Sequence, residues 1–557
     1  MRWKSLIKPQ IDEPFPAWRI FPVVFVALYA SHFTLLRLPY FWDEAGYYIP
    51  AAWDFFRTGT LIPISTMTNA HPPLPSIYLA LWWKLSGFSP EVTRTSVLMI
   101  ASFGLVAVWR LAMRLTNVAS VAFWTVALTA LYPVWFAQST LAHADIFAAA
   151  CSLWGIVYAL PAIGTLNNQA GKPWAAAAWF ALAALSKETA IIIPLTLAAV
   201  SLVEGIRAPG RARIRLRQEA AWFSSCLLPL AAWYAYHYAK TGFLLGNPDF
   251  LRYNAQANLD AFRIAAAFGY RLLHLTAHMN LFVPVGMALA SLLLDPRPNG
   301  VQISEISGQL PLDINPQLRP AIAPASMLRI FYLLLANALF FSVLGGALLT
   351  RYLLPMFPLV LLVSVHTIYR RVPYWHGLAI FSAVAFILGL FINPPYRFAP
   401  EDNLAYARVI RLHLDGINQL ERLNPGATVL TAWPLTDELT RPELGYVKSP
   451  FAVARIEDFT ASQIARASQE PQEYSVALVF STKYDPPSLP LSLGAKGEVV
   501  DEQYFGLHHD LQPEAIALQL HGSMVWKRED HGLWIALIRF NRQFDVQLNP
   551  NRSPSGI

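Results

Sequence analysis

Long apolar runs recur along most of this 557-residue chain, and they constrain its fold more than any other feature of the sequence. A helix that crosses the hydrocarbon core of a bilayer needs about 20 mostly apolar residues. Runs near that length lie at residues 20–38, 93–113, 119–138, 141–161, 188–205, 219–239, 273–294, 328–347, 352–369 and 374–393, and a shorter run lies at 174–186. Only 14% of the residues are charged, whereas soluble domains contain about 25%. The sequence therefore predicts an α-helical polytopic membrane protein with about 11 spans, embedded in a lipid bilayer.

Lysine and arginine in the short loops predict the orientation, because cytoplasmic loops of membrane proteins are enriched in both. The N-terminus is basic, five arginines lie between residues 207 and 217, and Arg370 and Arg371 follow another apolar run. With about 11 spans, all of these fall on one side of the membrane. We therefore expect a multi-pass protein of the plasma or inner membrane with a cytoplasmic N-terminus. The net charge of +7 belongs to this asymmetry and does not point to a nucleic-acid partner.

The sequence changes in character after Asn393. Residues 404–423 (LAYARVIRLHLDGINQLERL) have the spacing of an amphipathic helix, whereas ATVLTAW, SVALVFS and GLWIALIRF are strand-like. Alternating helix and strand signals favour an α/β domain. We therefore expect two domains: a transmembrane domain at 1–395 and a small soluble α/β domain at 396–557 on the extracytoplasmic side.

Acidic residues lie where the predicted spans meet the outer surface. Asp43 and Glu44 follow the first apolar run in YFWDEAGYYIP (residues 40–50), and Asp145 opens the run at 141–161. A carboxylate within a span costs about 2.5–3.5 kcal/mol at the membrane centre, so such residues are candidates for function. Two plainer explanations stay open: a polar loop for the adjacent pair, and a favourable interaction with the helix dipole for Asp145. Because neighbouring residues do not share a helix face, only one of Asp43 and Glu44 can point at a substrate.

Cationic residues are predicted on the same membrane face. His71 is followed by two prolines in NAHPPLP, Lys187 lies in LSKETA, Arg252 in DFLRYNAQ and Arg351 in LTRYLLPMFP. Lys187 and Arg252 could simply extend to the headgroup region, as long cationic side chains do. Arg351 and its neighbour Tyr352 open a span after a double glycine. Carboxylates, cations and an interfacial groove together predict a site for an anionic, lipid-borne substrate.

The order of these motifs resembles a known family. An Asp-Glu pair after the first span, then HPPL, then the interfacial segment 72–88 is similar to the protein O-mannosyltransferases. FAQSTLAHAD, ALSKE and RYLLPMFP are similar to further stretches of the wider GT-C group, including aminoarabinose transferases and relatives of glycosyltransferase family 39. The resemblance covers residues 15–395. It implies a GT-C-like fold and a glycosyltransferase that moves a hexosyl or pentosyl group, with inversion, from a polyprenyl-phosphate-linked sugar to an acceptor hydroxyl on the outer face.

The resemblance also assigns roles to individual residues. Asp43 matches the catalytic acid of the family, Glu44 its neighbour, and Tyr47 a loop tyrosine near the donor. His71 matches the histidine of the mannosyltransferases, a position that holds lysine in the aminoarabinose branch. Pro-Ser follows HPPL where the mannosyltransferases have Gly-Lys, and their β-trefoil domain is not apparent. The acceptor, which is a glycan, lipid or protein hydroxyl, is therefore left open.

The chemistry of such a transfer sets what the site needs. A lipid phosphate is a good leaving group, so the reaction needs a base for the acceptor hydroxyl and positive charge for the departing phosphate. We expect the catalytic residues to be Asp43 as general base, Glu44 and Asp145. We expect the substrate to be bound by Tyr47, His71, Lys187, Arg252, Arg351 and Tyr352. A divalent cation bound by the carboxylates is an open alternative, although no spacing in the sequence demands a metal or another cofactor.

Two functions from other classes also stay open. A secondary transporter would place charged residues near the bilayer midplane in broken helices, often with internal repeats. Here the acids gather at one predicted surface, and no repeat relates the first half to the second. A non-catalytic scaffold would present the outer domain to partners. The sequence does not identify the sugar, the acceptor, the length of the lipid or the oligomeric state.

Overall fold

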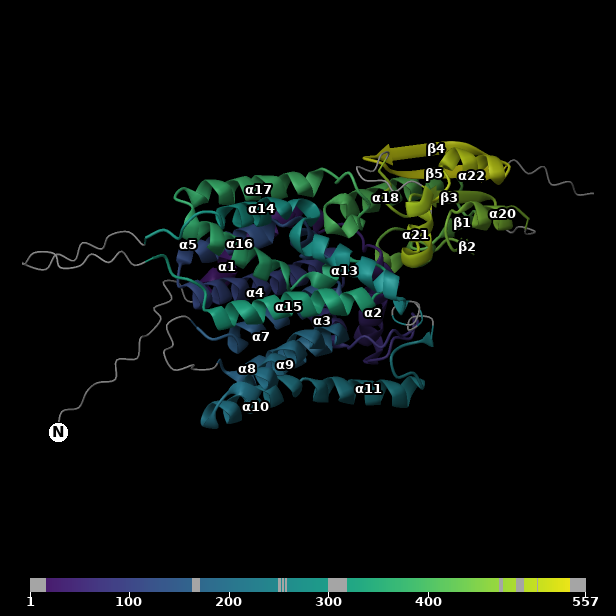
Figure 1. Cartoon of the computed structure of the whole chain (residues 1–557). Coiled ribbons are helices and arrows are strands. Elements are labelled where there is room, and N and C mark those ends of the chain that lie inside the picture. The colour runs from purple at the N-terminus through teal and green to yellow at the C-terminus, as the bar shows by residue number, and fades with distance from the viewer. Residues whose placement is uncertain are drawn as a thin grey trace, which may run out of the picture. The chain divides into compact units, whose positions relative to one another are not determined.

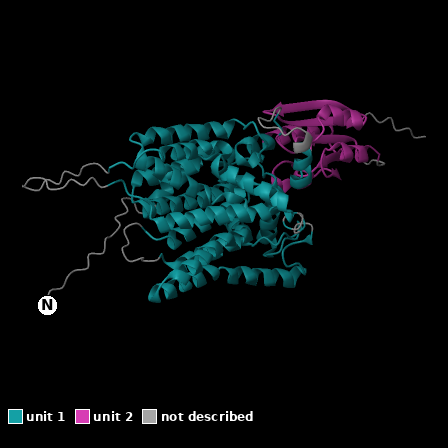
Figure 2. Ribbon diagram, in the orientation of Figure 1, with its two compact units in different colours: residues 1–410, 485–507 teal, residues 411–484, 508–557 magenta. Residues whose placement is uncertain are grey.

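The computed structural model describes residues 17–162, 171–248, 252, 255, 258–298, 318–469, 474–486, 495–507 and 509–540. The chain forms two compact units (Figure 2). The first comprises residues 1–410 and 485–507, and the second comprises 411–484 and 508–557. The sequence places the boundary after residue 395, whereas the first unit continues to Ile410 and includes a later segment.

Helices dominate the first unit, and in Figure 1 the longest of them, such as α4, α15 and α17, run roughly parallel. The helices are α1 (Ala17–His32), α2 (Ile49–Thr58), α3 (Leu74–Ser86), α4 (Pro90–Thr116), α5 (Ala119–Leu131), α6 (Pro133–Gln138), α7 (Ala144–Ala159), α8 (Pro173–Ser186), α9 (Ile192–Arg207), α10 (Gly210–Ser224), α11 (Leu227–Thr241), α13 (Ala261–Thr276), α14 (Phe282–Ser291), α15 (Pro324–Val343), α16 (Phe357–Arg371), α17 (Trp375–Phe391) and α21 (Ala495–Phe505). Short helical turns separate some of them: η1 (Phe33–Leu35), η2 (Glu44–Tyr48), η3 (Glu188–Ile191), η5 (His278–Asn280), η6 (Thr350–Leu353) and η7 (Pro400–Asp402).

The longest helix, α4, shows how local sequence defines these elements. Ser89 caps its start, because the Ser89 hydroxyl accepts a hydrogen bond from the Val92 amide at 3.2 Å. Asn117 ends it in the left-handed conformation, with φ of 52°. The helix between them has 27 residues and is mostly buried. It packs against α7, which in turn packs against α8, so these helices form the interior of the unit.

Each predicted apolar run coincides with helix, but four runs are interrupted. The run at 352–369 contains the turn between η6 and α16. The run at 119–138 divides into α5 and α6 at Tyr132, because Pro133 disfavours a helical residue before it. The run at 219–239 divides between α10 and α11. The run at 273–294 bends by 100° between α13 and α14, where Met279 has φ of 47°. Proline and left-handed residues therefore break helices that hydropathy alone joins.

The number of spans is not settled by helix length. Among the described residues, three helices are long and apolar enough to cross a membrane, or four if the bent pair forms one span. The three are Pro90–Thr116, Glu188–Arg207 and Pro324–Val343. Five shorter apolar helices also lie in the described parts of the chain. The mostly helical character is confirmed, whereas the count of about 11 spans stays a prediction.

The second unit contains a five-stranded sheet with strand order β2-β1-β3-β5-β4. Its strands are β1 (Val429–Ala432), β2 (Val453–Ile456), β3 (Val476–Phe480), β4 (Gly522–Asp530) and β5 (Leu533–Phe540). β1 is parallel to both β2 and β3, whereas β5 is antiparallel to β3 and β4. Its other elements are most of α18 (Ala405–Leu423), then α19 (Leu435–Thr440), η8 (Pro442–Leu444), α20 (Ala461–Gln469) and α22 (Pro513–Gln519).

One glycine permits the close packing of α18 on this sheet. A Cβ atom at Gly416 would lie 2.5 Å from Cδ1 of Ile535 in β5, which is closer than two carbon atoms can approach. The predicted helix at 404–423 and the strands in ATVLTAW, SVALVFS and GLWIALIRF are all present as α18, β1, β3 and β5. A small sheet at the C-terminal end of the chain is thus confirmed.

Candidate active site

Asp43 and Glu44 lie at the start of η2 and have different surroundings. Glu44 is fully buried. Its Oε2 accepts hydrogen bonds from the Phe41 amide at 2.8 Å and from Arg94 Nη2 at 3.2 Å, and its Oε1 accepts one from the Ala142 amide at 2.7 Å. Burial raises the pKa of Glu44, and the charge of Arg94 opposes this effect. These contacts make Glu44 a link between the η2 segment and the segment before α7.

Arg94 completes this link from the first turn of α4. Its side chain is fully buried and donates to the backbone oxygens of Leu38, Pro39 and Thr140 at 3.0, 2.5 and 2.8 Å. Four acceptors, including Glu44, therefore satisfy a cation that has no access to water. The sequence analysis did not single out Arg94, although an arginine at the start of an apolar run is a usable signal.

Arg351 in η6 is the centre of a second, larger cluster. Its Nη2 contacts Asp43, its Nη1 lies 2.5 Å from Oε2 of Glu401, and its Nε lies 3.4 Å from Oδ2 of Asp145. The Arg351 side chain is only 3% exposed, whereas that of Asp43 is 34% exposed. Four elements distant in sequence thus bring three carboxylates to one guanidinium group.

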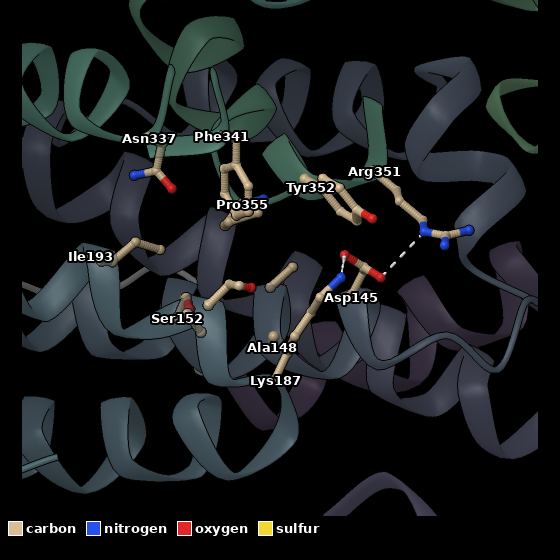
Figure 3. Close-up of a pocket in the computed structure, with 13 residues that line it drawn as sticks. Asp145, Ala148, Ser152, Lys187, Ile193, Asn337, Phe341, Arg351, Tyr352 and Pro355 are labelled. Carbon is tan, nitrogen blue, oxygen red and sulfur yellow. Dashed lines mark hydrogen bonds and ion pairs between the residues drawn. The ribbon is translucent and has the colours of Figure 1, made fainter. Parts of the chain in front are cut away.

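Lys187, between α8 and η3, joins the cluster from another side. Its Nζ lies 2.6 Å from Oδ1 of Asp145, in the first turn of α7, and 4.3 Å from the centre of the Tyr352 ring. Figure 3 shows Asp145 between the two cations, with a dashed line to each. Two cations therefore fix the orientation of the Asp145 carboxylate, and Tyr352 packs against one of them.

A small cavity of about 20 Å³ lies beside these charges and opens toward the surface. In Figure 3 the charged groups lie at one end of the pocket, and Ile193, Phe341 and Pro355 lie away from them. The pocket is lined by Asp145, Ala148, Ala149, Ser152, Lys187, Thr189, Ala190, Ile193, Asn337, Phe341, Arg351, Tyr352 and Pro355. One end of the cavity is ionic and the remainder of its lining is mostly apolar.

His71 lies in an aromatic group with an acid of its own. Its Nδ1 is 3.0 Å from Oε2 of Glu188, and its ring stacks on Tyr48 with 5.9 Å between centres. Tyr47 meets the same imidazole edge-on at 5.3 Å. The ring of Tyr48 also lies 5.8 Å from that of His143. Glu188, which the sequence analysis did not select, therefore orients the imidazole of His71 from the turn after Lys187.

One family model and two solved structures are similar to this chain. Residues 70–237 match the family model described as dolichyl-phosphate-mannose-protein mannosyltransferase. ArnT from Cupriavidus metallidurans, in its apo crystal structure, has 14% sequence identity to this chain. The alignment covers 94% of this chain and 98% of the ArnT chain, with a TM-score of 0.50. The structure of the same protein bound to undecaprenyl phosphate is also 14% identical, covers 93% and 97%, and has a TM-score of 0.52. No curated protein matches the chain.

The chain has the GT-C glycosyltransferase fold. This confirms the fold that the motifs implied and places the chain among membrane proteins. At 14% identity the likeness establishes the fold alone, so the substrates must be argued from the site. The matched segment 70–237 carries His71, Asp145 and Lys187, whereas Asp43 and Arg351 lie outside it.

Within this GT-C fold, most of the predicted site residues converge. Asp43, Asp145, Lys187, Arg351 and Tyr352 form one cluster through the contacts given above. Arg252, in contrast, is exposed and takes no part in the described contacts of this cluster. Among the described residues, no three acidic, histidine or cysteine side chains converge in a way that would hold a metal ion.

Two further residues of the GT-C site were not predicted. Glu401 in η7 is buried, and burial raises its pKa to about 8 although Arg351 opposes the shift. His143 precedes α7, and its Nδ1 lies 2.9 Å from Oε1 of Gln138 and 3.4 Å from Nη1 of Arg351. Nothing in the local sequence of Glu401 distinguishes it from a loop residue. His143 lies in the motif FAQSTLAHAD, inside an apolar run, and this position is a signal that could have identified it.

Proposed function

We propose that this protein transfers a sugar from a polyprenyl-phosphate-linked donor to an acceptor hydroxyl on the outer face of the membrane, with inversion at the anomeric carbon. The observation that carries this proposal is the pocket, because its ionic end adjoins a mostly apolar wall. A polyprenyl phosphate likewise has an anionic head and an apolar chain. The structure of ArnT bound to undecaprenyl phosphate supports the same class of donor for a chain of this fold.

Asp43 is the general base in this proposal. Asp145 and Glu401 are buried, whereas the side chain of Asp43 is 34% exposed and can meet an acceptor. Arg351 contacts one oxygen of Asp43 and fixes its direction. The acceptor oxygen attacks the anomeric carbon while its proton moves to Asp43. The bond from that carbon to the phosphate oxygen breaks, and the phosphate leaves with a second negative charge.

Lys187 supplies positive charge to the leaving phosphate, and His71 helps to bind it. Lys187 lines the pocket and lies close to its ionic end, beside Tyr352. Preorganised charges of this kind stabilise a transition state because they need no reorientation as charge develops. Arg351 adds to the positive potential while it holds Asp43 and Glu401. Asp145 orients both Lys187 and Arg351.

The membrane orientation is part of the proposal. With about 11 spans and a cytoplasmic N-terminus, the loops that carry Asp43, His71, Lys187, Arg351 and Glu401 all lie on the outer side. Helix ends, rather than the middles of helices, carry these residues. This placement favours an interfacial enzyme over a transporter whose charged sites lie at the bilayer midplane.

The proposal is tested by donor consumption. Purified protein in lipid nanodiscs is incubated with a panel of polyprenyl-phosphate-linked hexoses and pentoses and with an envelope extract as a source of acceptors. Mass spectrometry should show release of free polyprenyl phosphate and a matching mass increase in one acceptor class. Glycolipids and glycans of a deletion strain should lack the same group. If no donor in the panel is consumed and the deletion strain's envelope is unchanged, the proposed function is wrong.

A further inference from the structure

The cluster around Arg351 contains more acids than bases. Asp43, Asp145 and Glu401 surround it, and the cations in contact with them are Arg351 and Lys187. Glu44 has Arg94 as its own partner, and Glu188 has His71. With all three carboxyl groups ionised, a buried site would carry an excess negative charge. Such a charge is costly in a poorly solvated environment and opposes the entry of a phosphate.

Glu401 is the acid best placed to carry the balancing proton. Asp43 is partly solvated, and Asp145 contacts two cations. Glu401 is buried and its carboxyl group contacts Arg351 through Oε2 alone. Its Oε1 is buried and has no hydrogen-bond partner among the described residues. Oδ2 of Asp145 also lacks a hydrogen-bond partner there, but it lies 3.4 Å from the cationic Nε of Arg351. A protonated carboxyl group fits this environment better than a charged one because one of its oxygens is unsatisfied.

The charged groups that face Glu401 come from several elements. Arg351 approaches it from η6, and the charges of Asp43, Asp402 and Asp145 also act on it. His143, at the start of α7, contacts the same Nη1 of Arg351 that Glu401 binds. Burial raises the pKa of Glu401 to about 8, Arg351 lowers it, and the three aspartates raise it. A carboxyl group with a pKa near 8 would be mostly neutral at pH 7 and mostly ionised at pH 9.

We propose that Glu401 is a positioning residue that sets the availability of Arg351 to the donor phosphate through its own protonation. Neutral Glu401 holds Arg351 weakly, so the guanidinium can turn an N–H toward a phosphate. Ionised Glu401 holds Arg351 by a charge-assisted hydrogen bond and adds negative charge beside the phosphate site. This inference rests on the proposed function and adds to it a residue beyond the last predicted span.

The direction of the pH effect follows. If only the form with neutral Glu401 binds the phosphate well, the apparent dissociation constant rises as the fraction of that form falls. With a pKa near 8, the affinity should fall about tenfold by pH 9 relative to pH 7. Glutamine has the shape of neutral glutamate and does not titrate. Glu401→Gln should therefore bind about equally well at both pH values.

The test measures binding of undecaprenyl phosphate to the full chain in nanodiscs between pH 6.5 and 9.5. Wild type and Glu401→Gln are compared at each pH, so that titration of the probe itself affects both proteins alike. Glu91→Gln is the matched control, because Glu91 is exposed and pairs with Arg37 at the start of α4. We expect the affinity for undecaprenyl phosphate to fall at alkaline pH in wild type and in this control. In Glu401→Gln the affinity should not fall in this way.

The outcomes separate this inference from the proposed function. Parallel curves for wild type and Glu401→Gln overturn the role of Glu401 and leave the donor class standing. No binding by any protein at any pH overturns both. If Glu401→Gln does not fold, Glu401→Asp provides the second measurement, because it keeps a titrating carboxyl group on a shorter side chain. Its affinity must also fall with pH, and a flat curve for Glu401→Asp contradicts the proposal.

Discussion

The sequence predicts Arg351 as a site residue but indicates only part of its role. Its place at the start of a predicted span suggested a contact with phosphate. The structure adds that its three nitrogens face three different carboxylates, on Glu401, Asp43 and Asp145. A guanidinium presents N–H donors from three separate nitrogens in one rigid plane, whereas the three donors of an ammonium group all radiate from a single nitrogen. Arg351 therefore orients the acids as well as contributing charge.

Arg351→Lys tests this role. The substitution keeps the charge and should reduce transfer by at least about tenfold, because Asp43 loses the fork that fixes it. Rates are measured against donor concentration, and membrane insertion is followed in parallel. Arg371→Lys, at the other end of α16, is the control and should behave as wild type. If both variants show wild-type rates, Arg351 is only an anchor for the helix end.

Glu44 should affect stability more than rate. Its carboxylate is fully buried, accepts two backbone N–H groups and pairs with buried Arg94. Removing one member of a buried ion pair typically costs about 3–5 kcal/mol, because the other charge is left without a partner. Glu44→Ala should therefore lower the thermal unfolding temperature in detergent, whereas Asp43→Asn should change it little. Equal unfolding temperatures for Glu44→Ala and wild type would refute a structural role for this acid.

The sequence reveals the residues of this site that stand out locally. Asp43, Asp145, Lys187 and Arg351 interrupt or flank apolar runs, so hydropathy exposes them. Glu401 is different, because it lies in a polar segment where an acid is ordinary, and only its burial against Arg351 gives it significance. Arg252 is the opposite case. It was predicted to bind substrate because it is cationic and on the predicted outer membrane face, but it is exposed in the structure.

At the scale of elements, the loop between α15 and η6 determines where Arg351 and Tyr352 lie. Two buried arginines of α13 hold it. Arg263 Nη2 donates to the backbone oxygens of Gly345 and Gly346 at 3.2 Å each, and Arg271 Nη1 donates to that of Leu349 at 2.9 Å. Buried cations that bind carbonyl groups fix a loop that has no regular structure of its own.

Gly345→Ala tests this loop. Gly345 has φ of 95°, and a Cβ there would lie 2.8 Å from the Tyr352 ring, so the ring must shift. The left-handed conformation alone costs a side chain about 1–2 kcal/mol. We expect transfer to fall by about tenfold, since small displacements near the chemistry have large effects. Gly269→Ala in α13, where nothing lies within 4 Å of the added atom, should keep its activity. Comparable loss in both variants would show a general effect on folding.

Elements were predictable where one local rule dominates. Apolar runs of sufficient length all became helices, and alternating or wholly apolar segments became β1, β3 and β5. β2 and β4 were not predicted, because Arg455 interrupts the apolar residues of β2 and β4 (GSMVWKRED) is rich in charge. Their strand conformation comes from pairing with β1 and β5, which is information outside their own sequence.

At the scale of the whole molecule, the orientation in the membrane is the prediction most open to direct test. About 11 spans with the N-terminus inside require residues after the last predicted span to be outside. A reporter fused after Ile557 should be active only when located outside the cytoplasm. A second reporter inserted after Arg207, between α9 and the arginine-rich helix α10, should be active only inside. The reverse result for the first reporter alone would show that the number of spans is wrong by one.

The central claim is that the cluster around Arg351 performs sugar transfer with Asp43 as the base, and one rate comparison tests it most directly. Release of polyprenyl phosphate from the preferred donor is measured for wild type, Asp43→Asn and the exposed control Glu91→Gln at saturating acceptor. Loss of a general base should slow Asp43→Asn by at least about 100-fold, with wild-type protein levels and an unchanged rate in Glu91→Gln. A rate for Asp43→Asn within a few-fold of wild type would contradict the assignment of Asp43 and, with it, the proposed mechanism.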